Sequence, residues 1–449
     1  MKWSPPRVFV CFLFAAFAAV ACNAAETEPP VEPPSTTIVI HAGAVLATPG
    51  ESPLGPQTIV VRDGRIVSMQ EGLRPASEFG TDAVLVDLSD KFVLPGLIDL
   101  HMHLAIIMDA SNETAASESR LALAVAGYSH KLLEAGVTTV RDVGDNTGVT
   151  FALRDSFANG ELPGPRTFAA GRIISRTGGH GAKQALPGSL PYTPAQCDGP
   201  ESCRRAVREN IEQGSDWIKV TVSGSGRESG GKADAQPILF EDEMRAVAEA
   251  AAQADRPIAA HAHSTRAINM ALTYGARTIE HGTYFDDASA ALFKRHGAFL
   301  VPTAFVADYV RSKLEMFAGG RDGRSEDDLK AWTTAALAGP GRAWRAGIRL
   351  GVGTDGGPSF EPTATARELE LYVASGVPAA EAIRAATSNG AEILGMGDQL
   401  GSVRRGYLAD LIAVDGNPLE EIARLQKVAF VMKDGIVYKS AAGRTQPVN

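Results

Sequence analysis

Histidines and an aspartate close several short apolar runs of this sequence. One run ends in His101-x-His103, and alternation along a β-strand points the two imidazoles to the same side. Two imidazoles on one face make half of a metal site. Later runs end at His261, His281 and Asp355, which are also common metal ligands. The spacing therefore predicts a metal centre assembled from several strand ends.

A lysine stands inside another apolar run, where Lys219 lies between Ile218 and Val220. Burial disfavours the charged ammonium form, so the pKa of this lysine is expected to fall. A neutral amine can react with carbon dioxide to give a carbamate, an anionic group with two oxygens that is able to bridge two metal ions. Lys219 is therefore a candidate carbamate ligand.

Eight apolar runs, each followed by an alanine-rich helical stretch, carry these residues. They cover residues 94–103, 137–143, 166–174, 217–222, 257–263, 278–283, 298–305 and 349–354. Such alternation predicts a parallel barrel, in which active-site residues lie at the carboxyl ends of the strands. Residues 36–91 and 401–445 instead alternate apolar and polar residues around Asp-Gly turns, as antiparallel strands do.

The predicted fold class is therefore α/β. A (β/α)8 TIM-like barrel is expected over residues 92–400, with a small β-sandwich domain formed by both chain ends, residues 36–91 and 401–445. No fixed repeat period is present, which disfavours a solenoid or a propeller.

The ligand pattern resembles the binuclear branch of the amidohydrolase superfamily. In that branch a His-x-His motif follows strand one, and Lys, His, His and Asp follow strands four, five, six and eight. All six positions are present, and the resemblance extends over residues 36–438. Residues 95–103, the Gly-Gly-His-Gly segment at 178–181 and residues 406–418 are most similar to Xaa-Pro and Xaa-Arg dipeptidases and N-acyl amino acid hydrolases near imidazolonepropionase.

The resemblance implies two divalent metal ions, with carbon dioxide incorporated as the lysine carbamate. One ion would be held by His101, His103 and Asp355, the other by His261 and His281, with carboxylated Lys219 between them. Zinc is expected for such ligands, and manganese or cobalt would fit. A hydroxide bridging the ions would attack the substrate. Asp355 would take its proton and pass it to the leaving nitrogen.

Two further histidines are candidates for substrate binding. His263 shares a strand face with His261. Several proteins of the resembling family carry Tyr at this position, where it is associated with binding the terminal carboxylate of the substrate. The replacement by His argues against a simple transfer of proline dipeptidase activity to this chain. His180 lies in the glycine-rich segment after strand three and could orient a substrate carbonyl or leaving group. A structural hydrogen bond is an equally good interpretation of both residues. Arg141 and Asp142 are interpreted as a structural ion pair.

The predicted function is a metal-dependent hydrolase that cleaves an amide bond of a dipeptide or an N-acyl amino acid, as a dipeptidase or carboxypeptidase-like peptidase does. Two alternatives use the same site: a cyclic amidohydrolase of the imidazolonepropionase type, and an esterase or lactonase. A metal-free binding protein on this fold is the non-enzymatic alternative. A net charge of -9 without a run of Lys or Arg argues against nucleic acid as a partner. The oligomeric state stays open, a homo-oligomer included.

The first residues have the pattern of an export signal. A basic start precedes an apolar stretch at 8–20 that is short for a membrane span. The following Ala-Val-Ala-Cys resembles a bacterial lipobox, in which Cys22 would be lipidated and tether the protein to a membrane; a cut just beyond it would release a soluble form. Residues 1–22 are a predicted signal peptide and 23–35 a proline-rich spacer. The expected location is the periplasm or, as a lipoprotein, the outer membrane of a bacterium.

Two of the four cysteines lie beyond this leader. Cys197 and Cys203 are expected in one loop, where an oxidising compartment would allow a disulfide. Two free thiols are an equally good interpretation, because spacing alone does not set the geometry of the bond.

Overall fold

The computed structural model describes residues 36–106, 117–181, 195–224, 232–319 and 324–440. The predicted signal peptide 1–22 with Cys22, the spacer 23–35 and residues 441–445 of the predicted β-domain lie outside these ranges. Among the helices of the described ranges, none combines the length and the apolar character that a membrane span requires.

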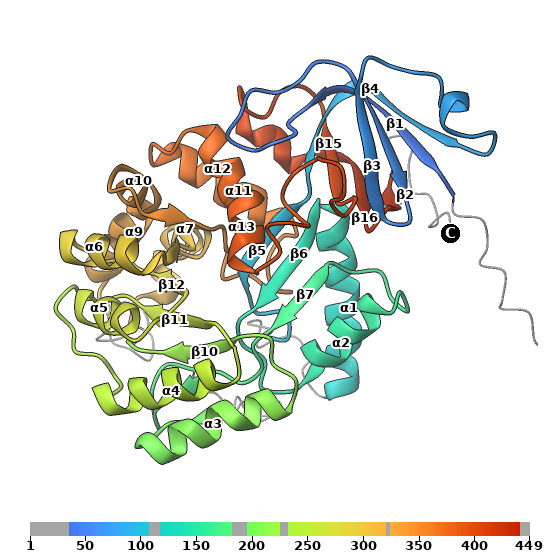
Figure 1. Cartoon of the computed structure of the whole chain (residues 1–449). Helices are drawn as coiled ribbons and strands as arrows, with labels where there is room; N and C mark the ends of the chain where they lie inside the picture. The colour runs from blue at the N-terminus through green and yellow to red at the C-terminus, as the bar shows by residue number, and fades with distance from the viewer. Residues whose placement is uncertain (1–35, 107–116, 182–194, 225–231, 320–323, 441–449) are drawn as a thin grey trace, which may run out of the picture. The chain divides into compact units, whose positions relative to one another are not determined.

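All eight predicted barrel strands are present, and several of them are labelled in Figure 1. In chain order they are β5 (Leu97–Met102), β6 (Val137–Asp142), β7 (Arg166–Ala169) continued by β8 (Ile174–Ser175), β10 (Ile218–Thr221), β11 (Ile258–Ala262), β12 (Thr278–His281), β13 (Phe299–Val301) and β14 (Arg349–Leu350). Parallel pairing runs from β5 to β7 and from β8 to β14. The barrel closes where Leu100 N donates to Val352 O at 2.8 Å and where Met102 bridges Gly356.

Helices follow the strands and carry the apolar faces that the alanine-rich stretches predict. They are α1 (Glu118–Glu134), α2 (Val149–Ala158), α3 (Pro200–Glu212), α4 (Glu241–Gln253), α5 (Thr265–Thr273), α6 (Asp287–His296), α7 (Ala304–Ser312), α8 (Leu314–Phe317), α9 (Glu326–Leu337), α10 (Gly339–Arg345), α11 (Ala364–Ala374), α12 (Ala379–Ala385) and α13 (Ser388–Ile393). Helix α5 illustrates how local sequence sets a helix and its buried face. The Ser264 hydroxyl caps the helix by accepting from Ala267 N, and Ile268, Ala271 and Leu272 are buried on one face.

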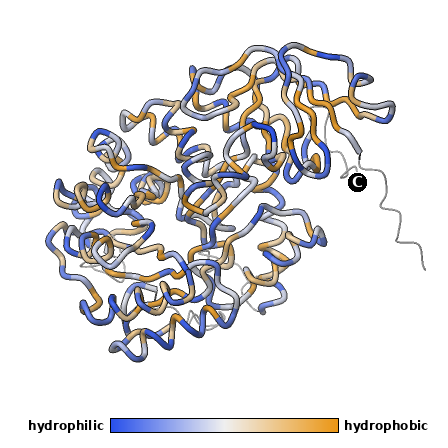
Figure 2. The backbone as a smooth tube through the Cα atoms, viewed as in Figure 1, coloured by the Kyte–Doolittle hydropathy of each residue, from blue (hydrophilic) through white to orange (hydrophobic). Residues whose placement is uncertain are grey.

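Strands from both ends of the described chain form a second, mixed sheet, drawn blue and red in Figure 1. Its order is β17 (Ile436–Lys439), β16 (Val428–Lys433), β15 (Leu411–Val414), β4 (Val84–Pro95), β1 (Ile38–Val45), β2 (Gln57–Arg62) and β3 (Arg65–Glu71). The short elements η1 (Ala76–Phe79), β9 (Ala195–Gln196) and η4 (Ile422–Gln426) complete the assignment. Figure 2 shows hydrophobic segments along the strands of this sheet. The predicted fold class, a barrel with a β-domain from both chain ends, is confirmed; its boundaries stay predictions.

The Asp-Gly turns of the sequence connect neighbouring strands of this sheet. Asp63 and Gly64 have φ of 51° and 74°, and Asp434 and Gly435 have φ of 50° and 77°. Positive φ at both central residues matches the right-handed twist of an antiparallel hairpin, and Asp-Gly is a preferred pair there. Local turn chemistry therefore fixes two hairpins of the terminal sheet.

Cys197 and Cys203 form a disulfide, the first of the two interpretations of this pair. Both side chains are fully buried. The bond joins the start of α3 to a segment in which Cys197 N donates to Ser175 O at 2.9 Å. It thereby anchors α3 beside β8, the last strand segment before the loop that carries His180.

An ion pair links the barrel to the terminal sheet. Arg166 of β7 donates from Nη1 to Oδ2 of Asp410 at 2.6 Å and also pairs with Asp434. The Asp410 side chain is only 4% exposed, and its Oδ1 accepts the backbone N–H of Asp434 at 2.8 Å. A nearly buried carboxylate of this kind needs its cation, because desolvation penalises an unpaired charge.

Replacing Arg166 with alanine is expected to lower the free energy of unfolding by about 3 kcal/mol, since Asp410 would stay buried without its cation. Arg349→Ala is the matched control: its partner Glu392 is 44% exposed, so the expected loss is below about 1 kcal/mol. Urea denaturation followed by circular dichroism measures both variants. Equal losses would contradict the role given to the Arg166 ion pair.

Candidate metal centre

The structure brings the predicted histidine and aspartate ligands together at the carboxyl ends of the barrel strands. The ligand atoms of His101, His281 and Asp355 lie within 4.8 Å of one another. Those of His261, His263 and His281 do the same, so His281 belongs to both groups. Two overlapping groups that share one histidine are suited to two neighbouring cations.

Lys219 and His103 complete the six predicted positions. Lys219 lies in β10, paired in register with Ala259 of β11, and is 2% exposed. His103 follows β5, and its Nε2 lies 3.3 Å from Oδ1 of Asp355. The role of each residue as a ligand stays a prediction, whereas their convergence at one rim is a property of the fold.

Hydrogen bonds hold one ring nitrogen of each of three predicted ligands. Nδ1 of His101 lies 2.7 Å from Oε2 of Glu280, Nδ1 of His103 lies 3.2 Å from Gly144 O, and Nε2 of His261 lies 3.2 Å from Gly224 O. A carboxylate or carbonyl oxygen can only accept, so the contacting nitrogen carries the proton. The other nitrogen of each ring then keeps its lone pair for a cation, as metal-binding histidines do.

His281 is oriented by a hydroxyl on the next strand end. Its Nδ1 lies 2.7 Å from Oγ1 of Thr303, and that hydroxyl donates to Pro302 O at 2.7 Å. Because the hydroxyl proton is used, Thr303 accepts from His281, and Nε2 of His281 keeps its lone pair. His281, Thr303 and Asp355 all have positive φ, of 68°, 53° and 57°. Such strain in non-glycine residues is typical of functional sites.

Unpartnered buried nitrogens show that this donor set fits metal ions. Nε2 of His101 and Nζ of Lys219 are buried without a hydrogen-bond partner. Nε2 of His101 lies 3.4 Å from Oδ1 of Asp355, the same oxygen that His103 approaches. Buried polar atoms normally have partners, and a cation between imidazole and carboxylate would satisfy these.

Burial and neighbouring groups together shift the pKa values of the predicted ligands. Burial and neighbouring imidazoles hold the pKa of His261 well below its usual value, and burial lowers the pKa of His263 to about 3. Burial likewise lowers the pKa of Lys219, to about 8. For Asp355, burial acts to raise the pKa, but His101 and His103 outweigh it, and the pKa lies well below its usual value. Neutral imidazoles and an ionised carboxylate are the ligand forms.

The interpretation of Arg141 and Asp142 as an ion pair is wrong. Arg141 Nη2 instead donates to Oε1 of Glu280 at 2.9 Å, with both side chains fully buried. The Asp142 carboxylate accepts the backbone N–H groups of Leu104 and Gly144 at 2.7 and 3.0 Å. Glu280, the partner of both Arg141 and His101, was missed by the sequence analysis; an acid inside an apolar run, directly before a ligand histidine, was its only signal.

The two predicted substrate-binding histidines lie against the ligand rings. His180 stacks on His261 with ring centroids 4.4 Å apart, and His263 stacks on His281 at 4.7 Å. Nδ1 of His263 also lies 2.8 Å from Oγ1 of Thr283. Both residues therefore line the ligand cluster, and His263 is close enough to belong to it.

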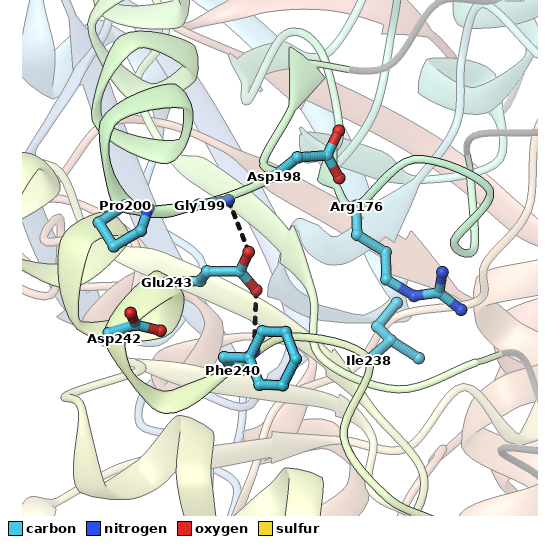
Figure 3. Close-up of a pocket in the computed structure, with 8 residues that line it drawn as sticks. All are labelled: Arg176, Asp198, Gly199, Pro200, Ile238, Phe240, Asp242 and Glu243. Atoms are coloured by element: carbon cyan, nitrogen blue, oxygen red, sulfur yellow. Dashed lines mark hydrogen bonds between the residues drawn. The ribbon is translucent and has the colours of Figure 1, made fainter.

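A separate pocket of about 390 Å³ lies between the start of α3 and the start of α4 (Figure 3). The described residues that line it include none of the six predicted ligands. In Figure 3 the Glu243 carboxylate points at both helix starts, where it accepts from Gly199 N at 2.7 Å and from Phe240 N at 2.8 Å. This carboxylate satisfies backbone donors, so we assign the pocket no chemistry.

Known proteins resemble this chain over most of its length. The model of the amidohydrolase family matches residues 92–438. Ochratoxinase from Aspergillus niger is 31% identical over 450 residues, 89% of this chain and 86% of that protein. A crystal structure of a Xaa-Pro dipeptidase with bound methionine in the active site matches with a TM-score of 0.81 and 31% identity, over 90% of this chain and 100% of that one. Imidazolonepropionase from Mesorhizobium japonicum is 26% identical over 400 residues, 82% of this chain and 88% of that protein.

Glu280→Gln is expected to weaken zinc binding roughly 10- to 100-fold, because an amide leaves Arg141 without a counter-charge and no longer fixes the proton on Nδ1 of His101. Calorimetric titration of the metal-free protein with zinc measures the effect. Glu392→Gln, at a carboxylate that is 44% exposed, is the control and should bind zinc normally. A folded Glu280→Gln variant with unchanged zinc affinity would contradict the positioning role of Glu280.

Proposed function

This chain belongs to the amidohydrolase family, and we propose that it is a metal-dependent hydrolase that cleaves the amide bond of a dipeptide or an N-acyl amino acid. The observation that carries the proposal is the cluster of His101, His281 and Asp355, in which Nε2 of His101 is buried without a hydrogen-bond partner. The similarity to a Xaa-Pro dipeptidase and to ochratoxinase supports an amide as the substrate.

Each predicted ligand has a place in this proposal. One metal ion would be held by His101, His103 and Asp355, a second by His261 and His281, and the carbamate of Lys219 would lie between them. Zinc suits these donors, and when bound it would polarise the scissile carbonyl and lower the pKa of an attacking water.

Asp355 is placed to move protons during the reaction. Its side chain is 24% exposed, whereas that of His101 is fully buried, so the carboxylate is reachable from the substrate side of the cluster. Its backbone N donates to His101 O at 2.8 Å, which fixes the residue against β5. As a carboxylate whose pKa lies well below its usual value, Asp355 would accept the proton of the attacking water and deliver it to the leaving nitrogen.

His180 and His263 would orient the substrate beside this cluster. Burial lowers the pKa of His263 to about 3, so its ring is neutral near pH 7. A neutral imidazole contributes a hydrogen bond and no positive charge. His263 would therefore bind a polar substrate group such as the carbonyl. Without a positive charge, it would not form an ion pair with a carboxylate of the substrate.

A cyclic amide is the second candidate substrate, supported by the similarity to imidazolonepropionase. The same donor set would also serve an ester or a lactone, because the attacking water and the polarised carbonyl are common to these reactions. A screen should therefore hold cyclic amides and lactones beside dipeptides and N-acyl amino acids.

The purified protein is expected to hydrolyse N-acyl amino acids or dipeptides, and Asp355→Asn should lower kcat about 10²- to 10⁴-fold, because the proton carrier is lost. Amine release in a fluorescence assay measures both. His41→Gln is the control. His41 lies on β1 of the terminal sheet, where its Nε2 contacts Arg74 O, and it is not one of the predicted ligands. Turnover confined to cyclic amides or lactones would overturn the peptidase proposal.

Carbamate formation at Lys219 should depend on pH in a defined direction. Only the neutral amine reacts. The pKa of about 8 makes roughly a tenth of the Lys219 side chain neutral at pH 7, roughly 300-fold more than for a lysine with the ordinary pKa of 10.5. In metal-free protein at fixed dissolved ¹³CO₂, one carbamate carbon signal should grow between pH 7 and 9 and be missing from Lys219→Ala, which keeps any signals of its α-amino group and other lysines. A signal that is absent above pH 8, or that survives in the variant, would exclude this bridge.

A further inference from the structure

A row of aromatic rings lies at the rim beyond strands β13 and β14. The centroids of Phe305 and Phe360 are 5.5 Å apart, those of Tyr309 and Phe360 are 4.9 Å apart, and those of Tyr309 and Phe317 are 6.2 Å apart. All three contacts are edge-to-face, the arrangement that aromatic pairs favour. The row therefore continues from the loop after β14 across α7 to α8.

The row begins on the two segments that follow Thr303 and Asp355. Phe305 stands two residues after Thr303, whose hydroxyl accepts from Nδ1 of His281. Phe360 stands five residues after Asp355, on the loop that leaves the neighbouring strand. Loops that follow adjacent parallel strands leave the same rim of a barrel, and substrates are bound there. The two phenylalanines therefore lie on the segments that leave this rim directly after Thr303 and Asp355.

Hydrogen bonds fix the backbone beneath both rings. Oε1 and Oε2 of Glu368, a fully buried residue of α11, accept the backbone N–H groups of Ala304 and Phe305 at the start of α7. On the other loop, Phe360 N donates to Gly357 O at 2.9 Å. Gly357 packs so closely that a Cβ there would lie 2.4 Å from His103 O. The backbone that carries the two rings is therefore held by hydrogen bonds and by close packing against His103. A preformed subsite requires such fixed positions.

These rings are only partly covered by protein. Phe305, Tyr309 and Phe360 are of intermediate exposure, whereas Ala304 and Ala307 of the same helix are buried. The ammonium of Lys313 lies 4.3 Å from the centroid of the Tyr309 ring and so caps part of it. Partly exposed aromatic surface at the rim of a hydrolase site is suited to stacking with an apolar or aromatic group of a ligand.

We propose that Phe305, Tyr309 and Phe360 form an aromatic subsite that binds an aromatic side chain of the substrate beside the scissile amide. The inference rests on the proposed amide hydrolysis and narrows its substrate class. Dipeptides and N-acyl amino acids that contain phenylalanine, tyrosine or tryptophan are the preferred substrates, ahead of those with alanine or glycine.

Two matched substrates test the subsite: N-acetyl-L-phenylalanine and N-acetyl-L-alanine. The wild-type enzyme should show kcat/KM roughly 10- to 100-fold higher for the phenylalanine compound, the range that burial of an aromatic ring supplies. Phe305→Ala and Phe360→Ala should each bring this ratio close to one while sparing the alanine compound. Phe240→Ala is the matched control, because Phe240 is 77% exposed and lines the separate pocket of Figure 3.

Binding without turnover separates failure of the subsite from failure of the proposed function. Calorimetry on an Asp355→Asn background should show tighter binding of the phenylalanine compound, lost on adding Phe360→Ala. If neither compound is hydrolysed but this binding pattern holds, amide hydrolysis fails and the aromatic subsite stands. Equal hydrolysis of the two compounds, or a preference that survives both substitutions, overturns the subsite. Should Phe360→Ala not fold, Phe360→Leu keeps the bulk without the ring and decides the question.

Discussion

The candidate site depends on the contacts that the fully buried carboxylate of Glu280 makes with Arg141 and His101. One oxygen of Glu280 accepts from Arg141 at 2.9 Å and the other from Nδ1 of His101 at 2.7 Å, and all three side chains are inaccessible to solvent. Burial acts to raise the pKa of Glu280, but the charge of Arg141 and the hydrogen bond with His101 outweigh it, and the pKa lies at about 2. Burying such a pair costs several kcal/mol per ion unless further hydrogen bonds compensate.

Those hydrogen bonds come from the barrel strands themselves. Arg141 donates from Nε to Leu100 O at 2.6 Å and from Nη1 to Oγ1 of Thr278 at 3.1 Å, and its guanidinium lies 4.3 Å from the centroid of the Trp217 ring. The pair therefore connects β5, β6 and β12 inside the barrel. Through its contact with Nδ1, Glu280 also directs the lone pair of Nε2 of His101 toward the ligand cluster. The same carboxylate therefore pairs with Arg141 inside the barrel and orients a predicted ligand at the rim.

The sequence predicts those features of the molecule that depend on neighbouring residues. The eight barrel strands and the His-x-His pair follow from apolar runs and strand alternation, and Asp63-Gly64 marks a hairpin by turn chemistry alone. The partner of Arg141 could not be found in this way, because Glu280 is 139 positions away and the adjacent Asp142 is the obvious local choice. The aromatic row was missed for the same reason: Phe305 and Phe360 meet only when the loops of two strands fold together. Long-range contacts of this kind leave no periodic signal in the sequence.

We propose that the ligand cluster holds two metal ions with Lys219 between them. The most direct test of this proposal is the metal content of the purified, fully metallated protein, measured by plasma mass spectrometry for the wild type and for Lys219→Ala. We expect about two divalent ions per chain in the wild type and one or none in the variant. A single ion in the wild type, or two ions retained without Lys219, would contradict it.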